Sequence, residues 1–485
     1  MVSTMSEGVR AGATIAGRLE PRSDPAAAVD SPVRVNQLAQ RAISGLLLAT
    51  VIVVPLIFHP TLDDGYALPK ISTLRILGLV VATVFLAHVV RGGSLARNVV
   101  PWIDVPLAIF VGLTLAASVV SVDPLQSFAG EPYQYQGLVT VLLYVGSFYL
   151  ARLSLGTSSG FRRVLIAVVG TGAVVSIYGI AQRLGVDPFW SGPPDDRIIS
   201  SVGQPNDLAA YLDLVVIAAV GLWSTAGTGA RIGLVVVVGV SLVALALTFS
   251  RGGYLGLIVA LAVLLIPRLR ALRSQPLGVA TLGIATGVLL VSLAIPTVRS
   301  VAEGVGERAM ATFDLGEGSI RFHVDQWRVG TQVAIDHPWL GTGPETFPLV
   351  FRPYLGQVLP PDRAALLDGF RLESPHNEFI GIAAEVGLPA TAAYVIFLIA
   401  CAGTCIRRAG RADGASSSIA LVVLAVLAAH VVTDFFKTPD VTTSEIFWIT
   451  MGAGLAAMGG AARRPGEQSS GRPADQPQGA AAGAR

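Results

Sequence analysis

Long apolar segments recur along the whole 485-residue chain, and they restrict its possible folds more than any other feature. A transmembrane helix needs about 20 consecutive apolar residues to cross the hydrocarbon core of a bilayer. Only 14% of the residues are charged, whereas a soluble domain usually carries about 25%. We therefore predict an all-α integral membrane protein with about 12 transmembrane helices and one large extracytoplasmic loop. The predicted spans are residues 42–58, 71–90, 102–121, 137–153, 161–182, 207–226, 232–249, 252–267, 277–297, 377–406, 417–435 and 443–462.

Both ends of the chain are polar. Residues 1–41 are rich in Ala, Ser and Pro, and residues 463–485 are rich in Gly, Ala, Pro and Gln. Such segments have too little apolar surface for a packed core, so we predict two disordered cytoplasmic tails. The first apolar run has no small-residue cleavage site and is predicted to be a true span rather than a signal peptide. The membrane domain then covers residues 42–462, with the large outer loop at about residues 298–375.

The charges in the short loops alternate in sign and predict the orientation. Basic residues in short loops favour the cytoplasmic side of a membrane. With the N-terminus inside, the inner loops hold Arg91, Arg97, Arg152, Arg162, Arg163, Arg231, Arg268, Arg270, Arg273, Arg407, Arg408 and Arg411. The outer loops hold Asp63, Asp64, Asp123, Glu131, Asp187, Asp195, Asp196, Asp434 and Asp440. We predict a multi-pass protein of the plasma membrane with both termini in the cytoplasm.

Arg251 is an exception to this charge pattern, because it lies on the predicted outer side. It stands between two apolar runs, with Ser250 before it and Gly252 and Gly253 after it. An arginine at the edge of a bilayer is costly unless it meets a partner or water, and the glycines let a bulky group approach. The simpler interpretation is an arginine whose side chain only reaches to the interface.

The large loop contains a segment with helical periodicity at residues 319–336. Its apolar side chains fall near one face: Ile320, Val324, Trp327 and Ala334. Its polar side chains fall on the other: Arg321, Asp325, Arg328 and Gln332. This spacing predicts an amphipathic helix at the membrane surface. An ordinary solvated face would give the same pattern.

The sequence Ser374-Pro375-His376-Asn377-Glu378 directly precedes an apolar helix. Ser374 suits an N-cap and Pro375 a first helical position, with Glu378 favourable in the first turn. His376 would then lie at a helix N-terminus, where the helix dipole disfavours the imidazolium and leaves a ring that accepts a proton. A histidine with satisfied interfacial hydrogen bonds is the alternative.

The other five histidines have no comparable neighbours in sequence, and no ligand set with metal-binding spacing is present. They are His59, His88, His323, His337 and His430. The two cysteines, Cys401 and Cys405, form no disulfide framework, and no phosphate-binding loop for a nucleotide is found. We therefore predict no metal and no cofactor. Lysine occurs only at Lys70 and Lys437.

Two carboxylates lie inside predicted spans. Asp213 follows Asn206 by seven residues and Glu385 follows Glu378 by seven, so each pair shares a helix face. Intramembrane carboxylates usually pair or line a water-filled path. Arg251 or another outer-face arginine is the natural partner, but the sequence does not assign the pairs.

Four motifs in order resemble the O-antigen ligase/O-antigen polymerase superfamily of membrane glycosyltransferases. The resemblance extends from about Val122 to Gly459. The motifs are Gly203-Gln204-Pro205-Asn206, Thr248-Phe249-Ser250-Arg251-Gly252, Arg321 and Trp327 with the segment His337 to Gly343, and Ser374 to Phe379 with the segment Glu385 to Leu388.

The resemblance implies transfer of a glycan from a polyprenyl-diphosphate carrier to a glycan, lipid or protein acceptor on the outer face. It implies that Arg251 and Arg321 bind the diphosphate, with Arg328 as the alternative to Arg321, and that His376 serves the acceptor. Asn206, Asp213, Asn377, Glu378 and Glu385 are expected to support this site. Neither a nucleotide sugar nor a nucleic acid is expected to take part, and a single inverting displacement without metal is predicted.

Two rival classes fit the spans. A transporter or flippase of lipid-linked oligosaccharides would use intramembrane carboxylates, but transporters often show repeated halves and this chain shows no internal repeat. A non-catalytic scaffold would leave Arg251, Arg321 and His376 without a shared purpose. Whether the chain is a ligase or a polymerase stays open, because both use the same donor and similar motifs.

Overall fold

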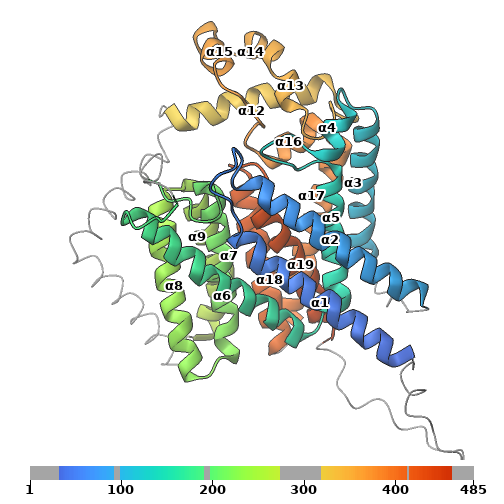
Figure 1. Cartoon of the computed structure of the whole chain (residues 1–485), viewed down its shortest axis with the longest axis vertical. Helices are drawn as coiled ribbons and strands as arrows, with labels where there is room; N and C mark the ends of the chain where they lie inside the picture. Colours follow the sequence, from blue (N-terminus) through green and yellow to red (C-terminus); the bar gives the residue numbers. More distant parts are fainter. Residues whose placement is uncertain (1–31, 92–98, 190–196, 273–317, 412–413, 461–485) are drawn as a thin grey trace, which may run out of the picture.

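The computed structural model describes residues 32–91, 99–189, 197–272, 318–411 and 414–460, and within these ranges the chain is helical and without strands (Figure 1). This confirms the all-α prediction. The α-helices are α1 (Pro32–Leu56), α2 (Ala67–Val90), α3 (Pro101–Val119), α4 (Pro124–Ala129), α5 (Leu138–Ser154), α6 (Ser158–Arg183), α7 (Pro205–Leu222), α8 (Thr228–Thr248), α9 (Arg251–Leu272), α12 (Gly318–Asp336), α13 (Phe347–Val350), α14 (Arg352–Val358), α15 (Pro361–Asp368), α16 (Glu378–Glu385), α17 (Leu388–Arg411), α18 (Ala415–Asp434) and α19 (Val441–Gly460).

Eight of the described helices are long and apolar enough to cross a membrane: α1, α2, α3, α6, α7, α8, α17 and α18. Helix α5 and the Arg251–Leu265 part of α9 are apolar but shorter. The predicted span at residues 277–297 lies outside the described residues, as do residues 1–31 and 461–485 of the predicted tails. Residues 32–41, which the sequence assigned to the first tail, form the beginning of α1. The chain is thus a multi-pass helical protein.

Helix α18 lies at the centre of the bundle and packs against α7, α9, α17 and α19. Small residues let the helices approach closely where side chains would otherwise separate them. A Cβ atom on Gly452 of α19 would meet the backbone of Phe148 in α5, and one on Gly172 of α6 would meet the side chain of Val215 in α7. These close contacts fix the relative depth of helices that are distant in sequence.

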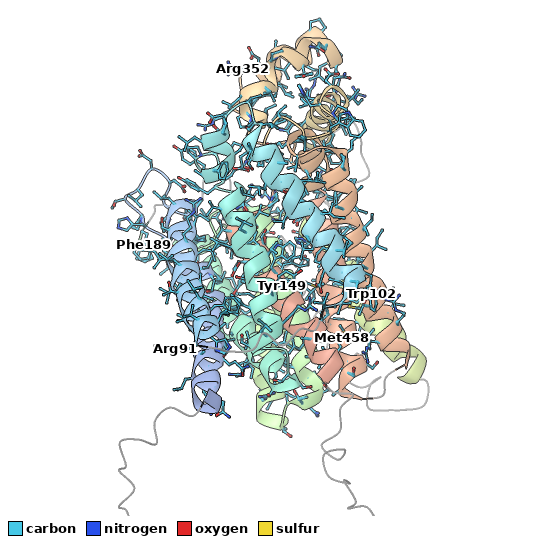
Figure 2. The ribbon with its side chains drawn as sticks, turned by 90° about the vertical axis from the view of Figure 1, so that its right-hand side faces the viewer. Arg91, Trp102, Tyr149, Phe189, Arg352 and Met458 are labelled. Atoms are coloured by element: carbon cyan, nitrogen blue, oxygen red, sulfur yellow. The ribbon has the colours of Figure 1, made fainter. Side chains whose placement is uncertain are left out.

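The two ends of the molecule differ in character. Helices α12 to α15 form a cap at one end, which carries Arg352, whereas Arg91 and Met458 lie toward the opposite end (Figures 1 and 2). The cap has its own small hydrophobic core, which includes Val329, Val333, Phe347, Leu355 and Leu367. The predicted amphipathic helix at residues 319–336 is confirmed as α12. The described part of the large polar loop is therefore folded.

The cap is joined to the bundle by backbone hydrogen bonds beside α16. The amide groups of Thr342 and Gly343 donate to the carbonyl groups of Ala384 and Glu385, at 3.1 and 2.8 Å. The predicted span at residues 377–406 differs from the structure, because the chain turns between α16 and α17 at Gly387, whose φ is 99°. That turn needs a residue without a Cβ atom and breaks the helix that the apolar pattern predicts as continuous.

Candidate functional site

His376 lies in the loop directly before α16, and its position differs in detail from the prediction. Asn377, and not Ser374, is the N-cap, and its side-chain oxygen accepts from the Ile380 amide at 3.1 Å. The Ser374 hydroxyl instead accepts from the His376 amide at 3.1 Å. His376 has a φ of 51°, a left-handed conformation that is unusual for histidine and frequent at functional sites.

Two histidines from different segments meet at this point. The rings of His376 and of His323 on α12 are 5.7 Å apart and edge to face. Burial, followed by His376 and Arg251, lowers the pKa of His323 to about 4. Burial also lowers the pKa of His376. Both rings are therefore neutral near pH 7, and Arg251 is close enough to influence His323.

Arg251 is the first residue of α9, and Asn206 holds the corner that precedes it. The Ser250 hydroxyl donates to Asn206 Oδ1 at 2.9 Å. Arg197 donates to the same oxygen at 3.0 Å and to the Thr248 carbonyl at 2.7 Å. Asn206 was predicted to support the site. Arg197, which is distant in the chain from the Arg251 corner, was not.

Arg321 and Arg328 are both exposed on α12. Arg328 is 4.0 Å from Asp325, which is buried and binds Arg363 at 2.7 Å. The spacing predicts Asp325 on a solvated face with the two arginines. Asp325 therefore differs from the prediction. Helix α12 instead turns His323 and Trp327, one helical turn apart, toward the bundle, and Trp327 packs edge to face on Phe435 at 5.5 Å.

Asp213 is fully buried in α7, and its carboxylate faces α9 near Gly256. Neither of its oxygens has a hydrogen-bond partner among the described residues. Among the residues that the structure describes, Asp213 has no hydrogen-bonded cation of the kind that the sequence predicts.

A buried charge network joins α7, α18 and the α18–α19 loop. Lys437 Nζ lies 2.8 Å from Asp440, 3.3 Å from Asp434 and 3.5 Å from Asp207. Burial alone would lower the pKa of Lys437, but the neighbouring carboxylates raise it well above its ordinary value. Lys437 was not among the predicted site residues. The rarity of lysine in this arginine-rich chain was the signal that could have found it.

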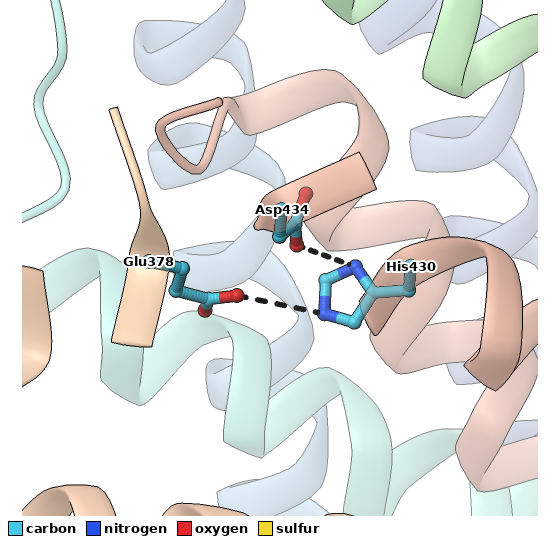
Figure 3. Close-up of side chains that lie close together, drawn as sticks. All are labelled: Glu378, His430 and Asp434. Carbon is cyan, nitrogen blue, oxygen red and sulfur yellow. Dashed lines mark ion pairs between the residues drawn. The ribbon is translucent and has the colours of Figure 1, made fainter. Parts of the chain in front are cut away.

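His430 joins this network to α16 (Figure 3). Its Nδ1 is 2.7 Å from Asp434, and its Nε2 is 3.3 Å from the Tyr394 hydroxyl and 4.0 Å from Glu378. His430 could not be selected as a site residue from the sequence, because its partners come from three helices.

Glu378, His430 and Asp434 have ligand atoms close enough together to hold a metal ion. The chemistry of the set does not favour one, because Asp434 already binds His430 and Lys437. Burial and Asp434 also raise the pKa of Glu378 well above its usual range, so this carboxyl tends to be protonated.

Glu385 binds the cap rather than an arginine. Its carboxylate accepts from the Phe347 amide at 3.0 Å, and the nearby Glu345 accepts from the amides of Glu131 and Gln136. Burial raises the pKa of Glu385 to about 7, and burial together with Glu385 raises the pKa of Glu345. Glu378 and Glu385 line one small cavity of about 110 Å³, as their shared helix face predicts.

The fold and this site define a multi-pass helical membrane protein with a folded polar cap over an arginine–histidine site. Residues 236–395 match the family model described as O-antigen ligase. The match contains Arg251, Arg321, His376 and Glu385, and it confirms the resemblance to the O-antigen ligase/polymerase superfamily that the motifs predict. The search of curated proteins finds no match to the chain.

Proposed function

We propose that this protein transfers a glycan from a polyprenyl-diphosphate carrier to an acceptor hydroxyl at the end of the molecule that carries the cap. We place that end on the outer face of the plasma membrane, in accord with the acidic outer loops and the basic inner loops. The observation that carries the proposal is the ring contact of His376 with His323 at the cap–bundle junction, where the charge of Arg251 acts on His323.

The leaving group of this reaction is a lipid diphosphate. Its developing negative charge is stabilised best by fixed guanidinium groups, which match phosphate oxygens in a planar fork. Arg251 supplies this charge near His323, which is in ring contact with His376. Arg321 and Arg328 are exposed on α12 and extend the cationic surface over the same end of the molecule.

His376 is the proposed general base. Its neutral ring accepts the proton of the acceptor hydroxyl as the acceptor oxygen bonds to the anomeric carbon. The bond from that carbon to the diphosphate oxygen breaks in the same step, and polyprenyl diphosphate leaves with the electron pair. A single displacement of this kind inverts the anomeric configuration and requires no metal.

An aromatic cluster lies next to the arginine corner. Trp327, Phe435 and Phe436 are in ring contact, and a Cβ atom on Gly252 would lie 3.4 Å from Phe436. Phe435 is 44% exposed. These rings offer an apolar surface to the first prenyl units of the carrier, directly beside the cation that would hold its diphosphate.

The test is transfer from a labelled polyprenyl-diphosphate oligosaccharide to cell-envelope acceptors by the purified protein in EDTA. We expect wild-type transfer with an inverted linkage, a loss of at least about 100-fold in His376→Ala and a loss of about 100-fold to 1,000-fold in Arg251→Ala. Arg352→Ala is the control, because Arg352 is exposed on the cap, where it pairs with Asp368 at 3.6 Å and lies over the Phe351 ring. The acceptor that gains the glycan separates a ligase from a polymerase.

The same preparations in proteoliposomes test the rival function. A lipid-linked glycan that crosses the bilayer, with no transfer to any acceptor, would replace the transferase with a flippase. A retained anomeric configuration would leave a transferase but exclude the single displacement.

A further inference from the structure

A second cavity, of about 330 Å³, is lined by His376. Its volume falls in the range of about 300–1,000 Å³ that is common for small-ligand sites. Five segments form its walls: the start of α2, the loop before α5, the start of α7, the loop before α16 and the α18–α19 loop. His376 therefore contacts His323 and lines this cavity as well.

The wall of this cavity is acidic. Five carboxyl groups line it, from Asp63, Asp64, Asp207, Glu373 and Asp440, against one lysine, Lys70. Lys437 pairs with Asp207 and Asp440. Among the described residues, Asp63, Asp64 and Glu373 belong to no ion pair within 4.0 Å. Lys70 directs its ammonium group to the backbone carbonyls of Ile57 and Ser201.

The polar atoms of the cavity favour a ligand that donates hydrogen bonds. The Gln134 side chain donates to Glu373 at 3.2 Å, but its buried oxygen has no donor within the described ranges. Carboxylates only accept hydrogen bonds. Those of Asp64 and Asp440 already accept from backbone amides, whereas the buried oxygen of Gln134 does not. Tyr133 is 46% exposed with Arg371 over its ring, and the C–H groups of a sugar can lie against the rest of its surface.

His376 connects two groups of opposite charge. Its ring meets that of His323, on which the charge of Arg251 acts, and His376 also lines the acidic cavity. A diphosphate is attracted to Arg251 and repelled by the carboxyl groups of the cavity.

We propose that this cavity binds the acceptor sugar, and that it selects a saccharide without negative charge and prefers one that carries an amine. This inference rests on the proposed transferase function. It places the acceptor hydroxyl next to His376, the proposed base. Phosphorylated or uronic-acid acceptors are excluded by the carboxylates.

The experiment measures binding of three trisaccharides to the full-length protein in nanodiscs by saturation-transfer NMR. The probes are trimers of glucosamine, N-acetylglucosamine and galacturonic acid, which are cationic, neutral and anionic. We expect the cationic trimer to bind about threefold to fivefold more tightly than the neutral one, as one favourable partly exposed charge pair allows. The anionic trimer is expected to show no binding.

The double variant Asp63→Asn/Glu373→Gln keeps the shape of the wall and removes two carboxylates that are in no ion pair. We expect the cationic and neutral trimers to bind it equally. Asp362→Asn is the matched control, because Asp362 is exposed on α15 of the cap and does not line the cavity. Equal binding of all three probes to the wild type, or an unchanged preference in the double variant, would overturn the inference.

Transfer is measured in parallel and separates the two hypotheses. Transfer activity without a charge preference in binding would refute the cavity assignment and leave the transferase intact. A charge preference without any transfer would refute the proposed function, and the acceptor assignment with it.

Discussion

At the residue scale, the site depends on side chains whose surroundings change their chemistry. His376 was selected from its neighbours in sequence, and the cause of its neutral ring is different from the one predicted. Asn377 caps α16, so the helix dipole acts on His376 only from outside the helix, and burial is the main cause of its lowered pKa. The predicted neutral ring agrees with the lowered pKa of His376. Its cause is burial, which the sequence could not show.

The pH dependence of transfer follows from this. A general base works only when unprotonated, and burial lowers the pKa of His376 below the ordinary histidine value of 6.5. Transfer should therefore be constant near pH 7 and fall only as the pH decreases below 6.5. His376→Gln should lose at least about 100-fold in rate and also this acidic limb.

The measurement is the initial rate of transfer between pH 4.5 and pH 8. His59→Gln is the control, because His59 is an exposed histidine whose ring bonds to Thr61. An acidic limb that persists in His376→Gln would assign the titration to another group, and His376 would lose its role as base.

At the element scale, two of the sequence motifs have a structural reason. The segment from His337 to Gly343 and the segment from Glu385 to Leu388 bind each other through their backbones, which includes a 2.8 Å bond from the Leu388 amide to the Pro338 carbonyl. Their glycines permit this approach. Gly341 and Gly387 both have positive φ, and a Cβ atom on either would meet the opposite backbone.

Gly387→Ala should loosen the cap. The substitution places a Cβ atom against the Trp339 carbonyl at a φ of 99°, which costs about 1–3 kcal/mol. We expect hydrogen exchange of the amides at residues 341–347 to become at least about fivefold faster. Gly369→Ala is the control, because Gly369 has an ordinary φ of −73° and its nearest neighbour would be at 3.4 Å. Equal exchange in both variants would show that this junction does not hold the cap.

At the scale of the whole molecule, the cap and the ends of α2 and α19 lie at opposite ends of the bundle (Figure 2). The loop charges predict that the cap is outside the cell. The beginning of α6, which carries the exposed Arg162, belongs to the predicted inner side.

Cysteine labelling tests this orientation. The native Cys401 and Cys405 are buried, so they give little background. In intact cells, a membrane-impermeant maleimide should label Asp362→Cys on α15 and should label Arg162→Cys only after permeabilisation. The reverse pattern would invert the protein and move the proposed reaction to the cytoplasmic face.

The sequence by itself determined the helical membrane class, the amphipathic α12 and the candidates Arg251, Asn206 and His376, because these depend on local periodicity and on neighbours in the chain. Only the tertiary structure brought His323 to His376, Lys437 to Asp207 and His430 to Tyr394. Those pairs come from segments far apart in sequence, and their distances follow from how the helices pack. The turn at Gly387 and the acidic cavity were decided in the same way, since both arise where the cap meets the bundle.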